Sequence, residues 1–190
     1  MSIPQSIDAE RAALFPIILS PHNPEWTLWY KDEEARLKKL LGERNIARVR
    51  HYGSTSVPDL IAKPIVDILL ELADGADADG LLSAFPYPEY IVIPNPTAAS
   101  TPDTLVLKGY TPTGFDRRVF HIHIRPRGDY HETAFRDYLL SHPKAAAEYA
   151  ELKLDLFKRY EYDRDGYTNA KSAFINGILG RIRANGNEKL

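Results

Sequence analysis

The clearest pattern in the chain is the alternation of apolar and titratable side chains in two segments, 65–72 and 118–124. In a strand, successive side chains point to opposite faces of the sheet. One face of each segment is therefore apolar, while the other carries Asp67 in the first segment and His121 and His123 in the second. The sequence predicts two strands that each have one core face and one face available for chemistry.

Apolar residues at helical spacing predict helices on both sides of these strands. The first helix is expected over about 24–41, where Asn23 can cap the first turn and Gly42 can end the last one. The remaining expected elements are strands at 46–51, 90–93 and 105–110, and helices at about 77–85, 131–141, 143–160 and from about 168 onward, with a turn at 163–166. This order predicts an α+β domain, in which a mixed β-sheet is flanked by helices and followed by a C-terminal helical block.

The composition fits one globular domain. The chain has 190 residues, of which 44% are hydrophobic and 26% are charged, so it can build a core and does not resemble a disordered protein. We expect an N-terminal extension over 1–20 and a single domain over 21–185.

Charge and residue types exclude several classes of function. The formal net charge of −2 argues against nucleic acid as a partner. The chain has no cysteine, which excludes a disulfide scaffold, a thiolate zinc site and a cysteine nucleophile. No apolar run approaches the length of a membrane span, and the first residues do not resemble a secretion signal. We therefore expect no membrane partner and a cytoplasmic protein.

The segment from Gly53 to Asp67 carries the strongest chemical signal. At a Gly-Ser turn, backbone N–H groups can approach phosphate oxygens, and Ser54 and Thr55 add hydroxyl donors. Lys63 adds a positive charge, and Asp67 could hold a divalent cation that bridges the phosphates. The alternative is an ordinary tight turn followed by a solvent-facing aspartate.

Two histidines follow on the later strand. His121 and His123 are two residues apart, which places their Cα atoms about 7 Å apart on one strand face. With Asp67 they could form a metal site of two imidazoles and one carboxylate. They could also donate hydrogen bonds to a phosphate, or act as acid and base. The alternative is two half-buried histidines that are bonded to neighbouring backbone.

Basic residues complete the set of candidate ligand-binding positions. Arg117 and Arg125 flank the histidine strand on the histidine face and suit recognition of phosphate, although a solvated strand end is the simpler interpretation for either one. Lys171 shares an apolar helix stripe with Tyr167, so it needs an acidic partner, a ligand or a path to solvent. Lys153 lies beside a similar stripe and has the same requirement.

Several motifs resemble those of a known family. Gly53-Ser54-Thr55-Ser56-Val57-Pro58 and Ala62-Lys63-Pro64-Ile65-Val66-Asp67-Ile68 resemble the signature of the GrpB family. Further similar segments follow in family order over about 20–183: Asn23-Pro24-Glu25-Trp26, His121-Ile122-His123, Phe135-Arg136-Asp137-Tyr138-Leu139, His142-Pro143, Tyr149, Leu152-Lys153, and Tyr167-Thr168 with Lys171 and Phe174. The chain is identified as a member of that family.

The resemblance implies a nucleotidyltransferase-like fold. The wider superfamily binds nucleotide phosphates at a Gly-Ser turn and holds two divalent metals with carboxylates two residues apart on the next strand. Gly53, Ser54 and Asp67 match this pattern, but Leu69 stands where the second carboxylate would be. Glu71 shares the face of Asp67 but lies about 13 Å along the strand, too far to share one ion. Related domains occur fused to an enzyme of coenzyme A synthesis, which hints at a nucleotide-like ligand.

We therefore expect a cleft that binds a nucleotide or other phosphorylated small molecule, with Mg²⁺ or another divalent cation as a candidate cofactor. Leu69 favours binding over catalytic transfer, because two-metal transfer needs close paired acids. Two alternatives stay open. One is an active nucleotidyl- or phosphoryltransferase in which Asp67, His121 and His123 are catalytic. The other is an accessory protein that acts through a protein partner.

Overall fold

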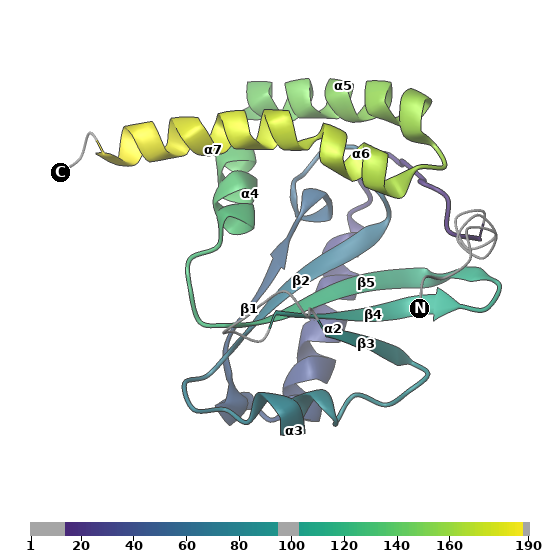
Figure 1. Cartoon of the computed structure of the whole chain (residues 1–190), viewed down its shortest axis with the longest axis vertical. Helices are drawn as coiled ribbons and strands as arrows, with labels where there is room; N and C mark the ends of the chain where they lie inside the picture. The colour runs from purple at the N-terminus through teal and green to yellow at the C-terminus, as the bar shows by residue number, and fades with distance from the viewer. Residues whose placement is uncertain (1–13, 95–102, 188–190) are drawn as a thin grey trace, which may run out of the picture.

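The structure is a computed structural model, and it describes residues 14–94 and 103–187. At its centre is a five-stranded mixed sheet with the strand order β1-β2-β5-β4-β3 (Figure 1). The strands are β1 (Ile46–Tyr52), β2 (Ile65–Leu72), β3 (Tyr90–Pro94), β4 (Thr104–Thr111) and β5 (Gly114–Pro126). The α-helices that flank it are α2 (Glu25–Leu41), α3 (Ala78–Leu82), α4 (His131–Ser141), α5 (Pro143–Tyr160), α6 (Arg164–Ala170) and α7 (Ser172–Asn187). The predicted α+β class with a mixed sheet is confirmed.

Strands β2 and β5 lie side by side and parallel, while the other neighbouring strands are antiparallel. Their register places Asp67 opposite His121 and Leu69 opposite His123. Residues that lie opposite each other in a sheet point to the same face, so the aspartate and both imidazoles share one face. The alternation in the sequence predicted this correctly.

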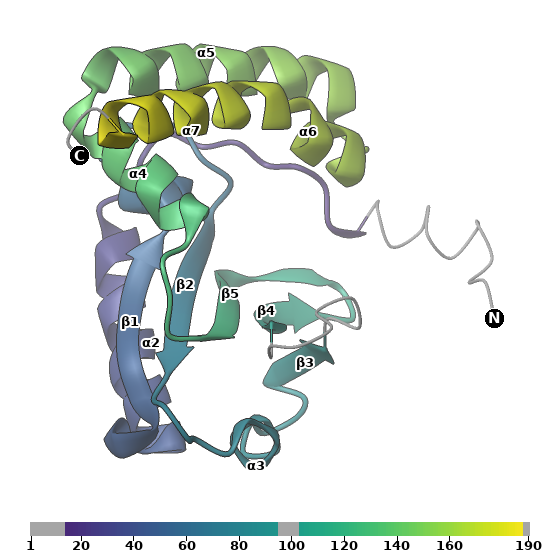
Figure 2. The ribbon, with the colours of Figure 1, turned by 60° about the vertical axis from the view of Figure 1, so that its left-hand side comes forward.

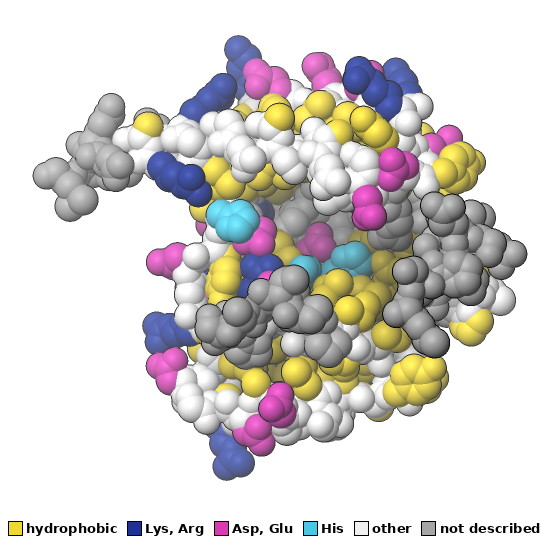
Figure 3. All heavy atoms as spheres, in the orientation of Figure 1, with side chains coloured by type: hydrophobic (Ala, Val, Ile, Leu, Met, Phe, Trp, Pro, Cys, Tyr) yellow, Lys and Arg dark blue, Asp and Glu magenta, His cyan; other side chains and the backbone are white. Residues whose placement is uncertain are grey.

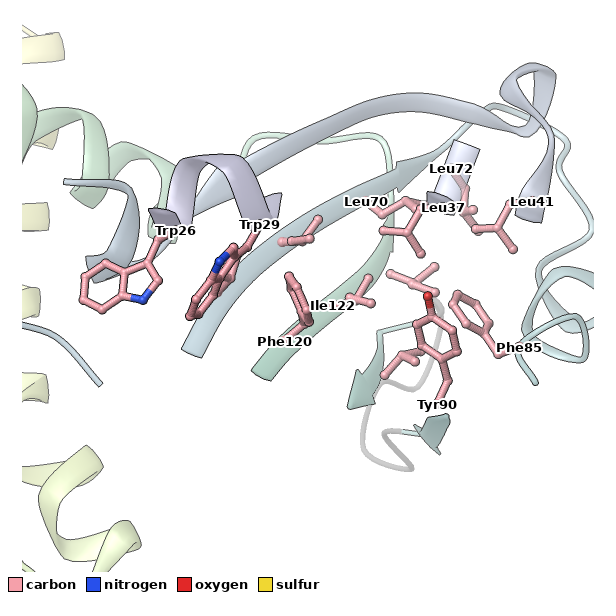
Figure 4. Packing of buried hydrophobic residues seen from close by; sticks show 14 of the residues in the cluster. Trp26, Trp29, Leu37, Leu41, Leu70, Leu72, Phe85, Tyr90, Phe120 and Ile122 are labelled. Carbon is pink, nitrogen blue, oxygen red and sulfur yellow. The ribbon is translucent and has the colours of Figure 1, made fainter. Parts of the chain in front are cut away.

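Helix α2 covers the other face of the sheet and forms the main core with it (Figure 4). Trp26 and Trp29 of α2 pack in one cluster with Phe120 and Ile122 of β5, and all four side chains are buried. Each such burial stabilises the fold by roughly 1.5–3 kcal/mol. This packing holds β2 and β5 in place and leaves the opposite face for chemistry.

Helices α4 to α7 form a block across one end of the sheet (Figure 2). A second core ties the block to the segment between β1 and β2, where Val57 and Leu60 pack with Phe135, Leu139 and Tyr149. The candidate site lies where this block meets the open face of the sheet.

The C-terminal helices differ from the prediction at one point. The turn predicted at 163–166 was wrong, because helix α6 begins at Arg164. Asp163 caps this helix, since its Oδ1 accepts a hydrogen bond from the Gly166 N–H at 2.8 Å. The last helix, expected from about 168, is therefore two helices that meet at Lys171.

Part of the predicted N-terminal extension packs against the domain. Residues 1–13 lie outside the described residues. Ile17 is buried and its N–H donates to the Glu161 carbonyl at 3.2 Å, while Ser20 pairs with Ala62 in an antiparallel bridge. The division into an extension and a single domain over 21–185 stays a prediction.

Within 14–94 and 103–187, no helix combines the length and the apolar character that crossing a bilayer would require.

Candidate functional site

The candidate site is a cleft between the open face of the sheet and the C-terminal helices. Figure 3 shows the molecule hollowed beneath these helices, with histidine and acidic side chains at the floor of the hollow. The cleft has two adjoining cavities of about 390 and 370 Å³, which share Ser54, Asp67 and Lys171 in their walls. We name the larger one the lysine cavity, for Lys63, Lys153 and Lys171, and the smaller one the aromatic cavity, for Tyr52, Phe135 and Tyr149.

Asp67 lies at the floor of the cleft, where β2 holds it. Its side chain is 28% exposed. Gly53 directly follows β1 and has a φ of +75°, and a Cβ at this position would lie 2.2 Å from Asp67 Oδ2. Glycine is therefore required at position 53 for two reasons: its positive φ, and the lack of room for a Cβ beside the Asp67 carboxylate.

The two hydroxyl residues after Gly53 have different surroundings. Ser54 lines both cavities. Thr55 also borders the lysine cavity, but its hydroxyl donates to the Ile65 carbonyl at 3.2 Å and lies 3.0 Å from His51 Nε2. The structure thus brings Ser54 to the cleft, whereas the Thr55 hydroxyl helps to fix the turn against β2.

Three lysines from different parts of the chain converge on the lysine cavity. Lys63 precedes β2, Lys153 lies on α5, and Lys171 lies between α6 and α7. Lys153 is almost fully buried and donates a hydrogen bond to the Ile61 carbonyl. The Lys63 and Lys171 ammonium groups lie 4.9 and 4.6 Å from the centre of the Tyr167 ring, a distance that gives favourable cation–π contact.

Three lysines and two carboxylates, Asp67 and Asp165, line the lysine cavity, and burial shifts the pKa of several of these groups. Burial raises the pKa of Asp67 to about 7, although the charges of Lys63, Lys171 and Lys153 oppose that rise. Burial and the neighbouring lysines lower the pKa of Lys153 to about 7, against the attraction of Asp67. Burial also lowers the pKa of Lys171. Among the described residues, neither Lys153 nor Lys171 forms an ion pair with a carboxylate.

The two histidines share a face but have different neighbours. His121 lines the lysine cavity, with Nδ1 3.7 Å from Asp67 Oδ1 and Nε2 2.7 Å from the Tyr110 hydroxyl. His123 packs edge-on against the Tyr52 ring at 5.7 Å, and burial lowers its pKa to about 4. The structure therefore places His121 beside Asp67 and leaves His123 among packed side chains.

The two arginines predicted as ligand contacts do not join Asp67. Arg125 makes hydrogen-bonded ion pairs with Asp103 at 2.9 Å and Glu132 at 3.0 Å. Arg117 is 80% exposed and lies 3.9 Å from a carboxylate oxygen of Glu25 in α2. Both lie on β5 as predicted, but acidic side chains from other parts of the chain, Glu25 of α2, Glu132 of α4 and Asp103, lie next to the guanidinium groups.

The residues around Asp67 do not fit the metal site that the sequence suggested. In the described parts of the chain, no group of three or more His, Cys, Asp or Glu side chains is arranged to hold a metal ion. Leu69 is buried on the strand next to Asp67, and Glu71 is fully engaged by Arg48 and Arg50. Three lysines around one carboxylate are also unfavourable for a cation. A metal role for Asp67, His121 and His123 stays a prediction.

The aromatic cavity was missed by the sequence reasoning. Tyr149 and Phe135 lie on apolar helix stripes, and such stripes do not distinguish a core from a cavity wall. Glu132 and Asn176 contribute polar groups to the same cavity. The signal that pointed toward it was the family-like segment 135–139, which begins with a residue of the cavity wall.

The fold and the cleft define an α+β protein with a mixed five-stranded sheet and a cationic cleft at one end. A sequence model described as GrpB protein matches residues 16–181, and the chain belongs to the GrpB family. The fold is similar to the crystal structure of the conserved protein GrpB from Enterococcus faecalis, with a TM-score of 0.74 and 31% sequence identity. That similarity covers 86% of this chain and 96% of the Enterococcus chain.

Two relatives are informative. A UPF0157 protein of Pseudomonas aeruginosa is 36% identical over 168 residues, which is 86% of this chain and 66% of that protein. A protein of Mycolicibacterium paratuberculosis named dephospho-CoA kinase is 29% identical over 198 residues. That match covers 93% of this chain and 48% of the kinase, so the chain spans about half of that relative.

Proposed function

We propose that this protein binds a phosphorylated small molecule, such as a nucleotide, in the lysine cavity. The observation that carries the proposal is the convergence of Lys63, Lys153 and Lys171 on one cavity whose carboxylates are Asp67 at the floor and Asp165 at an exposed position. An anion with several negative charges fits this arrangement.

The buried ammonium group of Lys153 gives the energetic reason for this proposal. Burying an ammonium group is costly unless an opposite charge or hydrogen-bond acceptors compensate it. Lys153 has one carbonyl acceptor and two cationic neighbours, and its pKa falls to about 7. A phosphate would supply the missing negative charge and several strong acceptors. The hydroxyl of Ser54, between the two cavities, is a further donor for it.

Binding fits the site better than two-metal transfer. Leu69 replaces one carboxylate that such transfer would use, and Glu71 is held by arginines. The relative named dephospho-CoA kinase supports the ligand class, because its name refers to a phosphorylated small molecule. The chain's own residues bind and orient the ligand in this proposal, and no step is assigned to a metal ion.

The test is isothermal titration calorimetry with inorganic pyrophosphate, ATP and coenzyme A, each with and without Mg²⁺. The wild-type protein should bind at least one of them without Mg²⁺. Lys153→Met and Lys171→Met should each weaken that binding at least about tenfold, which corresponds to 1.4 kcal/mol. Lys158→Met, at an exposed position of α5, is the matched control and should leave binding unchanged.

Two results would count against the proposal. One is a folded wild-type protein that binds no member of the panel. The other is binding that all three lysine variants retain equally, which would place the ligand elsewhere. Binding that appears only with Mg²⁺ and vanishes in Asp67→Asn would favour the alternative of an atypical metal site.

A further inference from the structure

The aromatic cavity adjoins the proposed phosphate site but has a different chemical character. Its apolar lining residues are Tyr52, Val57, Phe135, Leu139, Tyr149 and Ile175. Its volume of about 370 Å³ falls within the range of roughly 300–1,000 Å³ that is typical of small-molecule pockets. A bare phosphate or pyrophosphate in the lysine cavity would leave this space unused.

The two cavities are continuous rather than separate sites. Ser54, Asp67 and Lys171 line both of them. A phosphate held by Lys171 would therefore lie at the border, with its ester oxygen able to point into the aromatic cavity. The aromatic cavity is also lined by polar groups, among them His131 and Arg136, so a ligand that spans both spaces would join a phosphate to a group with both apolar surface and polar atoms.

One carboxylate oxygen in the aromatic cavity accepts no hydrogen bond from the described residues. Glu132 Oε1 accepts a hydrogen bond from Arg125 at 3.0 Å. Glu132 Oε2 is buried and has no hydrogen bond among the described residues, and His131 Nδ1 lies 3.6 Å from it. Buried acceptors are almost always satisfied, so an N–H or O–H donor on a ligand would complete this site.

We infer that the ligand is a phosphate ester of a flat, donor-bearing ring, with the phosphate in the lysine cavity and the ring in the aromatic cavity. This inference rests on the proposed function and adds the nature of the organic part. Aromatic walls favour a flat ring over a flexible chain, because stacked and edge-on ring contacts add to the area that is buried. A nucleoside 5′-monophosphate has this chemistry.

The experiment compares the affinities of inorganic phosphate, AMP, adenosine and phosphopantetheine for the full chain. AMP should bind at least about tenfold more tightly than phosphate. Phosphopantetheine carries the same phosphate on a flexible chain and should show little of this gain. Adenosine, which has the ring without the phosphate, should bind more weakly than AMP.

A pair of variants on α7 locates the ring. Asn176 lines the aromatic cavity from an exposed helix position, so Asn176→Trp should fill the cavity without disturbing the core. This variant should reduce the affinity for AMP to that for phosphate and leave phosphate binding unchanged. Ala173→Trp, exposed on the same helix and outside the cavity wall, is the control and should bind AMP like the wild type.

The outcomes separate this inference from the proposed function. If neither phosphate, AMP nor any of pyrophosphate, ATP and coenzyme A binds, the proposed function fails and the inference fails with it. If phosphate binds but AMP binds no more tightly, the inference alone is overturned. It is also overturned if phosphopantetheine shows the full gain or if Asn176→Trp binds AMP like the wild type.

Discussion

Two carboxylates on one face of β2, four residues apart, have opposite surroundings. Glu71 is fully buried, and its oxygens accept hydrogen bonds from Arg48 at 2.5 and 2.8 Å, from Arg50 at 3.1 Å and from the Gly128 N–H at 3.0 Å. Burial tends to raise its pKa, but these donors outweigh burial and lower it. Asp67 accepts no hydrogen bond from the described residues, and burial raises its pKa to about 7.

The difference separates a structural carboxylate from one held for a ligand. At Glu71 the fold supplies every donor that the carboxylate needs, so the charge contributes to stability. Around Asp67 the fold places Lys153 and Lys171, neither of which forms an ion pair with the carboxylate among the described residues, and His121 Nδ1 lies 3.7 Å from Asp67 Oδ1. A carboxylate with so little compensation costs stability, as is common at functional sites.

The largest expected effect follows from neutralising the structural carboxylate. Glu71→Gln leaves Arg48 and Arg50 without their anion at a buried position. We expect the free energy of unfolding to fall by about 1–3 kcal/mol, because the buried Glu71 loses its charge-assisted hydrogen bonds while Arg48 and Arg50 stay partly exposed to water. Urea unfolding at 25 °C measures this. A loss as small as that of an ordinary surface substitution would remove the contrast between the two carboxylates.

The next largest loss of stability is expected when Gly53, the glycine beside Asp67, is replaced. Gly53→Ala places a Cβ where Asp67 Oδ2 lies, whereas Gly75→Ala has a similar φ of +79° and no atom within 4 Å. We expect both variants to lose about 1–2 kcal/mol through backbone strain, and only Gly53→Ala to lose ATP affinity as well. Equal ATP binding by both variants would show that the position of the Asp67 carboxylate does not matter to the ligand.

Asp67→Asn is expected to change the free energy of unfolding less than the previous variants, and to increase it rather than lower it. The folded wild-type protein binds the Asp67 proton more tightly than the unfolded chain does, because the pKa is about 7 rather than 3.8. Protonation of Asp67 therefore adds to the free energy of unfolding of the wild type at low pH, and this contribution is lost as the pH rises from about 4 to 7. Asp67→Asn has no such titration. Its free energy of unfolding relative to the wild type should therefore increase over that pH range and level off above pH 7.

The measurement for Asp67→Asn is the melting temperature between pH 5 and pH 8 without ligand. A gain of about 1 kcal/mol at pH 8 would raise it by roughly 2–4 °C for a chain of this size. A variant that is less stable than wild type at pH 8 would mean that Asp67 is already well paired.

Much of the fold could be predicted, because the spacing of apolar and polar residues along the chain matches the helices and strands of the structure. The alternation around Asp67 and His121 predicted their shared face, since a half-buried strand must separate its apolar and polar residues. The start of α6 at Arg164 could not be predicted, because Asp163 and Gly166 are typical of both a turn and a helix start.

The candidate site was predictable only in part. Asp67, Lys153 and Lys171 do meet in one cavity, because titratable groups on core-facing positions need a reason to be there. Arg125 is diverted by Asp103 and Glu132, and such pairing across loops depends on tertiary structure that spacing does not encode.

The proposal that the lysine cavity binds an anion is tested most directly by proton uptake during binding. At pH 8 a phosphate monoester is almost fully ionised, since its second pKa is about 6, so it contributes little to the proton balance. Lys153, with a pKa of about 7, is mostly neutral at that pH, and a bound anion should raise its pKa. A bound anion also raises the pKa of Asp67, which is about 7, so the titration uses Asp67→Asn as the background. Titration of AMP into this variant in buffers of different ionisation enthalpy should show proton uptake, and the addition of Lys153→Met should abolish most of it. Binding with no proton uptake, or with the same uptake once Lys153→Met is added, would contradict the account.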